Sequence, residues 1–310
     1  MTGFYKDLAA ALLAVDREHT PVNVGLAAAL ACLLEVSAPK PGNVSPGRHF
    51  ADLRYEDFLA SAIAIGEPLA GAGARSVGAT VRLAVEATAR WTRSNTNLGI
   101  VLLLAPIARA AIMAEGRQDD VPHAALRTRL RQVLEATTIE DARDAYAAIR
   151  LATPGGLDHA ESQDVSTEPT LSLVDVMGLA AHRDTIAREY VTGFEVTFET
   201  AVPALERARQ DGLSWDDAVV ETFLTVLAST PDTHIARRSG ADLAAFATAR
   251  AGAVLAAGGV RSASGRGAID EMDRALRDGR NSGNPGTTAD LTAAAIFVVL
   301  LGGGFHAVTR

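Results

Sequence analysis

The sequence predicts an all-α fold, and three observations support this prediction. Alanine and leucine are abundant in the 310 residues, whereas period-2 alternation, the mark of strands, is nearly absent. Apolar residues recur at helical spacing, as at Leu26, Leu30, Leu33 and Leu34, which fall on one face of a helix. Hydrophobic residues make up 48% of the chain, enough for a substantial core. We expect one bundle-like domain over residues 1–310 with about ten to twelve helices.

Capping residues mark the predicted starts of several helices. Pro21 suits the first helical position, and Thr20 before it can act as the cap. Thr138, Ser214 and Ser239 each stand three residues before an acid, which is a variant of the capping box. These positions therefore predict three further helix starts.

Two apolar runs, residues 98–108 and 293–304, predict buried core helices. Both are too short and too interrupted for a membrane span of about 20 residues. No secretory signal pattern opens the chain, so we expect a soluble, cytoplasmic protein that does not bind membranes. The single cysteine, Cys32, lies in an apolar helix and is expected to be a buried structural thiol.

The net charge of −8 argues against nucleic acid as the main partner, because binding a phosphate backbone needs a basic face. It leaves room for a small anionic ligand in a local pocket. The scattered histidines suggest no Ser-His-Asp group, and the phosphate-binding motif G-x-x-x-x-G-K-[ST] is absent. We therefore expect the functional residues to lie in the loops.

Five breaks between the predicted helices are dense in Gly, Pro, Asn, Asp and Thr. They cover residues 37–50, 92–99, 151–169, 229–240 and 279–290. Backbone N–H groups where loops meet helices bind phosphate oxygens, Lys and Arg neutralise charge, and Asp carboxylates bind Mg²⁺. We expect these loops to gather on one face and to bind a polyphosphate with Mg²⁺.

The first loop, SAPKPGNVSPGRHF, contains Lys40, one of only two lysines in the chain; the other is Lys6. In an arginine-rich chain a retained lysine suggests a point charge in a narrow place, although chance explains two lysines equally well. In the last loop, Pro285 and Gly286 predict a turn.

The other loops offer anion and metal ligands, each with a simpler explanation. Thr287 or Thr288 can cap the last helix and bind an anion there, with Asp290 in the first turn, but a plain helix cap would look the same. Asp232 and Arg237 suggest a metal ligand beside a phosphate clamp, or a solvated charge cluster. Asp164 belongs to an acidic loop that could lie simply at the surface. Asn95 and Asn97 can bind a nucleotide or cap a helix.

Taken together and in order, these stretches resemble the triphosphoribosyl-dephospho-CoA synthase family. The resemblance rests on EVSAPKPGNVSP, HFADLRYEDFLASAIAI, NTNLGIVLLLAP, DTHIARRSG and NPGTTADLTAAAIFVVLL, from about residue 30 to 300. It implies an all-α enzyme that joins ATP to 3′-dephospho-CoA. In that reaction the 2′-hydroxyl of the acceptor ribose attacks C1′ of ATP, and adenine leaves. The product is a prosthetic-group precursor.

The resemblance also suggests site residues. Lys40, Pro41, Gly42 and Asn43 match the family's K-P-G turn, with Lys40 expected to meet phosphate. Asn95, Asn97, Arg237, Gly286, Thr287 and Thr288 complete the predicted nucleotide ligands. Asp52 and Asp232 are the predicted catalytic residues, and Asp164, Asp232 and Asp290 the predicted Mg²⁺ ligands.

This chain departs from the family pattern in ways that concern the acceptor. It has RSNTNLGI where citrate-lyase relatives carry a loop with His and Lys, and residues 153–190 look like a divergent branch. A related transferase in another cofactor pathway, such as one serving methanopterin-type cofactors, is therefore an alternative. A hydrolase or phosphotransferase and a non-catalytic nucleotide sensor are further alternatives. A homo-oligomer is possible.

Overall fold

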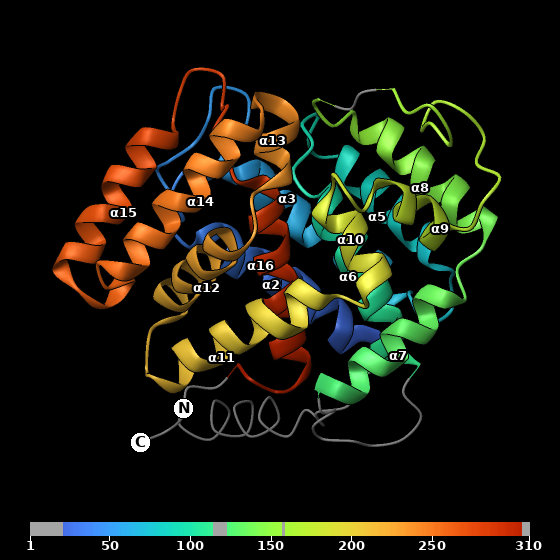
Figure 1. Cartoon of the computed structure of the whole chain (residues 1–310). Helices are drawn as coiled ribbons and strands as arrows, with labels where there is room; N and C mark the ends of the chain where they lie inside the picture. Colours follow the sequence, from blue (N-terminus) through green and yellow to red (C-terminus); the bar gives the residue numbers. More distant parts are fainter. Residues whose placement is uncertain (1–20, 114–122, 157–158, 306–310) are drawn as a thin grey trace, which may run out of the picture.

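The computed structural model describes residues 21–113, 123–156 and 159–305. The predicted all-α fold is confirmed, because every regular element in these ranges is helical (Figure 1). In the described part of the chain, β-type pairing is limited to one isolated bridge between Ser45 and Arg48. Lys6 and Thr20 lie outside the described residues.

The helices differ widely in length, and several short ones stand between the long ones. In chain order they are α2 (Pro21–Ser37), α3 (Tyr55–Ala64), α4 (Gly66–Ala70), α5 (Val77–Ala89), α6 (Leu98–Ile112), α7 (His123–Glu135), α8 (Ile139–Ala152), α9 (Leu173–Ala180), α10 (Thr185–Thr192), the π-helix η1 (Thr197–Ala201), α11 (Val202–Gln210), α12 (Trp215–Ser229), α13 (Thr233–Ser239), α14 (Ala241–Ala256), the 3₁₀-helix η2 (Gly259–Arg261), α15 (Ala263–Leu276) and α16 (Gly286–Leu301). The expected ten to twelve helices were too few, because short helices such as α4 and α13 are set off by turns that apolar spacing does not reveal.

Helix α16 runs through the centre of the fold and packs against α2, α6, α11 and α12 (Figure 1). It is apolar on all sides, and Ile296 and Phe297 are completely buried. Helix α6 is buried over most of its length in the same way. Both apolar runs are therefore core helices, as predicted. Buried apolar residues from α2 to α16 form one large cluster, while one domain over residues 1–310 stays a prediction.

Helix α2 turns a different face to the core from the one predicted. Its leucines are not fully buried: Leu26 is 63% exposed, while Leu33 and Leu34 are half-buried and pack against the core. The buried face consists of small side chains such as Ala28 and Cys32. Small residues let backbones approach closely: a Cβ added at Gly25 would lie 2.4 Å from the carbonyl oxygen of Gly66 in α4. Close packing thus outweighed the hydrophobicity of leucine, and the predicted burial of Cys32 is confirmed.

The helix caps are confirmed at two of the three predicted positions. The hydroxyl groups of Thr138 and Ser214 accept hydrogen bonds from the N–H groups of Asp141 and Asp217 and cap α8 and α12. Ser239 does not cap a helix: it ends α13, and its hydroxyl donates to the carbonyl oxygen of Ser282. The turn into α14 is made by Gly240, whose φ of +96° favours glycine.

One described stretch, Ala241–Arg261, is long and apolar enough to cross a membrane by length and composition, and 33% of its most apolar window is buried. It contains α14, which packs against α12, α13 and α15. A helix of a folded core passes the same test, so the stretch is weak evidence for a span. The cytoplasmic location stays a prediction.

Candidate functional site

A cavity of about 730 Å³ opens between α6, α8, α9, α10, α13 and α16. Each of the five loops predicted to carry function contributes residues to its wall, although their positions in the sequence span most of the chain. The fold therefore brings the predicted loops together at one site.

Most of the predicted site residues line this cavity, and a smaller group does not. Those in the wall are Asn43, Asp52, Asn95, Asn97, Asp164, Arg237, Gly286, Thr287 and Asp290. Those outside it are Lys40, Pro41, Gly42, Asp232 and Thr288.

Lys40 is completely buried and is paired with Glu35 of α2. Its Nζ lies 3.0 Å from Glu35 Oε1 and donates hydrogen bonds to the carbonyl oxygens of Glu35 and of Ala38, the latter at 3.1 Å. Burial lowers the pKa of Lys40 and raises that of Glu35, while the attraction between the two charges opposes both shifts. Glu35, and not Lys40, reaches the cavity wall. This geometry does not support the expected contact between Lys40 and phosphate.

The turn after Lys40 is anchored to distant parts of the chain. The N–H group of Gly42 donates to Asp273 of α15 at 2.8 Å, and the amide of Asn43 donates to the side-chain oxygen of Asn284 at 3.0 Å. Gly42 has a φ of +74°, and a Cβ there would lie 2.9 Å from the Cβ of Leu276. The turn thus needs glycine for both its conformation and its packing.

Asp232 caps α13 and fixes the start of α16. Its Oδ1 accepts from the N–H of Ile235 at 2.9 Å, and its Oδ2 accepts from both the N–H and the hydroxyl of Thr288 at 2.7 Å. The hydroxyl of Thr287 accepts from the N–H of His234 at 3.1 Å. The prediction that Thr287 or Thr288 caps the last helix is wrong, because α16 starts after Pro285 without a side-chain cap. With both oxygens bound, Asp232 acts as a structural residue.

Asp290 is the predicted carboxylate that is left without a partner. It lines the cavity, and its carboxyl group forms no hydrogen bond or ion pair with any described residue. Desolvation raises its pKa well above the ordinary value, and the charges of Glu35, Asp232 and Asp184 raise it further. Its Oδ2 comes so close to α6 that a Cβ added at Gly99 would lie 2.0 Å away. Gly99 thus makes room for this carboxyl group.

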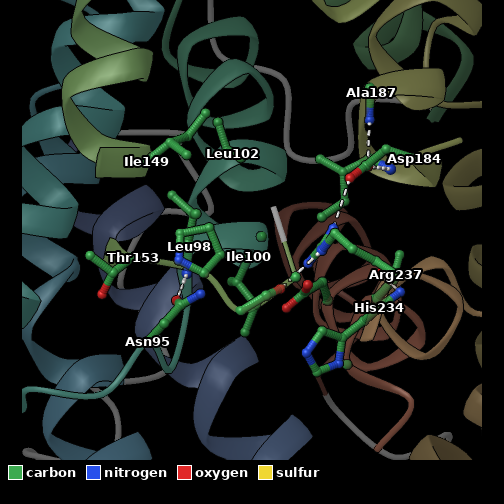
Figure 2. A pocket seen from close by; sticks show the side chains of 18 of the residues that line it. Asn95, Leu98, Ile100, Leu102, Ile149, Thr153, Asp184, Ala187, His234 and Arg237 are labelled. Atoms are coloured by element: carbon green, nitrogen blue, oxygen red, sulfur yellow. Dashed lines mark hydrogen bonds and ion pairs between the residues drawn. The ribbon is translucent and has the colours of Figure 1, made fainter. Parts of the chain in front are cut away.

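An ion pair between Arg237 and Asp184 lies on the opposite wall from Asn95 (Figure 2). Arg237 Nη1 is 3.2 Å from Asp184 Oδ2, and Nε donates to the carbonyl oxygen of Gly155 at 3.2 Å. Asp184 also caps α10 by accepting from the N–H groups of Ile186 and Ala187. We did not predict Asp184 as a site residue. An acid at the start of a helix is explained by capping alone, so the sequence does not indicate its ion pair with Arg237.

Three further cavity residues escaped the sequence analysis. Arg93 and Arg183 line the cavity, and their guanidinium groups make no hydrogen bond or ion pair with a described residue, so their charges are available to an anion. Single arginines in an arginine-rich chain carry no distinguishing pattern. His234 Nδ1 lies 3.0 Å from the carbonyl oxygen of Asn284, so Nδ1 must donate and Nε2 is left as an acceptor. Burial lowers the pKa of His234, which keeps the ring neutral.

The remaining predicted residues divide between capping and free groups. Asn95 Oδ1 accepts from the N–H of Leu98 at 3.1 Å, so Asn95 supports the start of α6 (Figure 2). Asn97 Nδ2 donates to Thr88 Oγ1 at 3.0 Å. Asp52 Oδ1 accepts from the amide of Asn281 at 2.8 Å, and its other carboxylate oxygen has no partner among the described residues. Asp52 thus keeps an acceptor facing the cavity.

Asp164 is held by its own loop. Its carboxylate accepts from the N–H of Ala160 at 2.7 Å and from the N–H and hydroxyl of Ser166, and His159 lies 3.4 Å away. These hydrogen bonds, led by that of Ser166, lower the pKa of Asp164. The described residues contain no group of three or more His, Cys, Asp or Glu that could hold a metal ion by themselves. Of the three predicted Mg²⁺ ligands, only Asp290 has both oxygens free.

The fold is that of an all-helical protein whose described residues bring unpaired arginines, helix starts and the unpartnered carboxyl group of Asp290 together around one cavity. Residues 21–308 match the CitG family model, described as ATP:dephospho-CoA triphosphoribosyl transferase, and the chain belongs to this family. The resemblance inferred from the sequence is therefore confirmed.

Individual relatives agree with this assignment. A crystal structure of a candidate triphosphoribosyl-dephospho-CoA synthase from Archaeoglobus fulgidus has a TM-score of 0.62 and 28% identity, over 81% of this chain and 99% of that one. The 2-(5''-triphosphoribosyl)-3'-dephosphocoenzyme-A synthase of Pectobacterium atrosepticum is 36% identical over 105 residues, 34% of this chain and 33% of its own length. A candidate synthase of Pseudomonas syringae pv. tomato is 34% identical over 108 residues, again 34% of this chain and 36% of the relative. The matched segment thus spans about a third of these curated relatives.

Proposed function

We propose that this protein is a transferase that moves the triphosphoribosyl group of ATP to the ribose 2′-hydroxyl of 3′-dephospho-CoA, with release of adenine. The observation that carries this proposal is the combination of charges in the cavity. Arg93 and Arg183 have no partner among the described residues, and Arg237 has one acidic partner. Such a set suits a ligand with several negative charges.

Helix starts add to this attraction. The first residues of α6, α10 and α16 lie in the cavity wall, represented by Leu98, Ile186 and Gly286. The N-terminus of a helix carries partial positive charge and free N–H groups, both of which favour phosphate oxygens. We propose that the triphosphate lies between these helix starts and the three arginines.

The reaction requires one proton to move away from the acceptor. A bond forms between the acceptor 2′-oxygen and C1′, and the bond between C1′ and the adenine nitrogen breaks, so its electron pair leaves with adenine. The hydroxyl proton goes to a base, and adenine takes a proton from solvent. We assign the base role to Asp52, whose second carboxylate oxygen is unpartnered in the cavity wall. Asp232 does not suit this role, because both its oxygens are bound.

The residues present also fit a Mg²⁺ ion that arrives with ATP. Mg²⁺ usually keeps waters and takes only one or two protein carboxylates besides the phosphates of its nucleotide. Asp290 is unpartnered and is surrounded by other acids, so a divalent cation would relieve its unfavourable ionisation. The ion would supply positive charge to the triphosphate. We propose Asp290 as its protein ligand.

The proposal is tested by incubating the protein with ATP, Mg²⁺ and 3′-dephospho-CoA and following adenine and product mass. We expect adenine release that depends on the acceptor, together with dephospho-CoA carrying a triphosphoribosyl group. Adenine without this adduct would replace the transferase by a hydrolase. Bound ATP without any adenine would contradict this acceptor, and pterin-type acceptors would be tried next.

A further inference from the structure

One half of the cavity differs chemically from the half that carries the charges. It is formed by α6, α8 and α9, and none of the lining residues on these three helices is charged. Its wall contains Leu102, Ala145, Ile149, Val176, Met177 and Leu179. Figure 2 shows Leu102 and Ile149 on one side of the site, and Asp184, His234 and Arg237 on the other. The cavity therefore has an apolar half and a charged half.

We infer that the apolar half binds the uncharged arm of the acceptor, the pantetheine portion of dephospho-CoA, and that Ile149 and Leu179 select for it. This inference rests on the proposed function, because dephospho-CoA is the acceptor proposed there. It assigns to α8 and α9 a role in acceptor choice that is separate from the role of the charged half.

The hydrogen-bonding groups of the apolar half favour an arm over a purine base. The hydroxyl of Tyr146 donates to the carbonyl oxygen of Gln163. The side-chain amide of Gln163 is bound at both ends by Thr170, at 2.8 and 2.9 Å. Among the polar side chains that α8, α9 and their caps contribute to the wall, only the hydroxyl of Thr153, the C-cap of α8, has no partner in the described part of the chain.

The wall that α8, α9 and their caps form thus offers one free hydroxyl, which is too few groups to pair the ring nitrogens and the amino group of adenine, and burying these unpaired is costly. The hydroxyl of Thr153 can form a hydrogen bond with one amide of the pantetheine arm, and the rest of that arm consists mostly of methylene and methyl groups. Apolar walls of this kind also gain binding free energy from each buried methylene group. The chemistry of the wall thus matches the arm better than the base of ATP.

The course of α6 gives the direction of the arm. Gly99, next to Asp290, lies in the first turn of α6, whereas Leu102 lies one turn further along. Asp290 thus lies at the start of this helix, and Leu102 further along it belongs to the apolar wall. Asp52, the proposed base, is tied to the loop before α6, because the hydroxyl of Ser94 donates to its carbonyl oxygen at 3.0 Å. An acceptor whose ribose 2′-hydroxyl lies near Asp52 would therefore extend its arm between α6, α8 and α9.

The test compares Ile149→Ser with Leu151→Ser. Both residues lie on α8, but Leu151 is 49% exposed and does not line the cavity. Binding of dephospho-CoA and of ATP is measured separately by calorimetry. We expect Ile149→Ser to lower the affinity for dephospho-CoA about tenfold and to leave the affinity for ATP unchanged, because the lost apolar contact is made with the acceptor alone. Leu151→Ser should change neither.

A second variant and a second probe keep the test independent of folding and turnover. Leu179→Ser changes a wall residue that is 47% exposed, so it should leave the fold intact. 4′-Phosphopantetheine, which has the arm but no ribose, should compete with dephospho-CoA and not with ATP. If 4′-phosphopantetheine competes with ATP, or if the variants lower the affinity for ATP alone, the inference is wrong and the apolar half binds adenine instead.

The two proposals fail in different ways. If the wild type binds dephospho-CoA, and Ile149→Ser weakens this binding as expected, but no adenine is released, the proposed reaction is wrong. The binding of the acceptor arm by the apolar half then remains supported. If adenine release depends on dephospho-CoA, and neither variant changes the affinity or the KM for dephospho-CoA, the proposed reaction is supported. The inference that the apolar half binds the acceptor arm is then wrong.

Discussion

Two segments with the same kind of sequence play different parts in this protein. Residues 40–43 (KPGN) and residues 285–290 (PGTTAD) both combine a Pro-Gly pair with polar side chains. In the first segment Lys40 is paired with Glu35, and Gly42 is bound to Asp273. In the second, the threonines are bound to α13 and its N-cap, but the carboxyl group of Asp290 has no partner among the described residues.

The difference lies in which polar groups the chain itself satisfies. A group bound by the protein on every side holds the structure together, whereas a desolvated group without a partner is available to a ligand. The first segment should therefore respond to mutation mainly in stability, and the second mainly in turnover. Substitutions in each segment test this difference.

The largest effect is expected from Lys40→Met. Removing the ammonium group leaves the buried Glu35 carboxylate without its partner, which should lower the free energy of unfolding by about 3–5 kcal/mol. Denaturant unfolding measures this. The double variant with Glu35→Gln should regain most of the loss, because the remaining charge is then removed as well. A stable Lys40→Met protein with weakened ATP binding would instead support the phosphate role expected from the sequence.

Asp290→Asn should act on turnover. The amide keeps the size of the side chain but binds Mg²⁺ poorly, so adenine release should fall about 100-fold and half-saturation should need more Mg²⁺. Turnover at several Mg²⁺ concentrations measures both. An unchanged Mg²⁺ dependence would remove Asp290 from the proposed metal site.

The same variant should also change the pH dependence of stability in the absence of nucleotide and metal. Folding raises the pKa of Asp290, so its protonated form adds stability below the unfolded pKa, and this is lost as pH rises through the folded pKa. Asp290→Asn lacks this contribution. Its stability relative to the wild type should therefore increase with rising pH, as thermal unfolding across a pH series would reveal. A constant difference would contradict the raised pKa.

Gly42→Ala should destabilise the first segment by about 2–3 kcal/mol, because it adds strain at positive φ and a contact with Leu276. Gly47→Ala is the matched control: its φ is +73°, but nothing lies within 4 Å of an added Cβ. It should cost only about 1 kcal/mol of backbone strain. Equal losses in the two variants, measured by denaturant unfolding, would show that packing against α15 contributes nothing.

The smallest effect is expected from Gly99→Ala, which changes the second segment through its neighbour. The added methyl group must displace Asp290 Oδ2, so turnover should fall about tenfold. Gly252→Ala in α14 has open space around the new Cβ and serves as control, with unchanged turnover and slightly higher stability. Normal turnover of Gly99→Ala would mean that the position of Asp290 is not critical.

From the amino-acid sequence alone we could predict the all-α fold, the burial of α6 and α16, two of the three helix caps and the loops that meet at the cavity. These features depend on the composition and spacing of residues that are close in the sequence, and such local patterns are enough to favour a helix. The family was also evident from the ordered motifs.

Which polar residues are available to a ligand depends on contacts that form in the folded protein. Lys40 and Asp232 had the residue types of a nucleotide site, but their partners, Glu35 and Thr288, occupy them. Asp184 and His234 gained their settings from residues about 50 positions away in the chain. Whether a polar group finds a hydrogen-bonding partner depends on such distant contacts and on how closely small residues let helices approach. Neither can be predicted from a local sequence pattern.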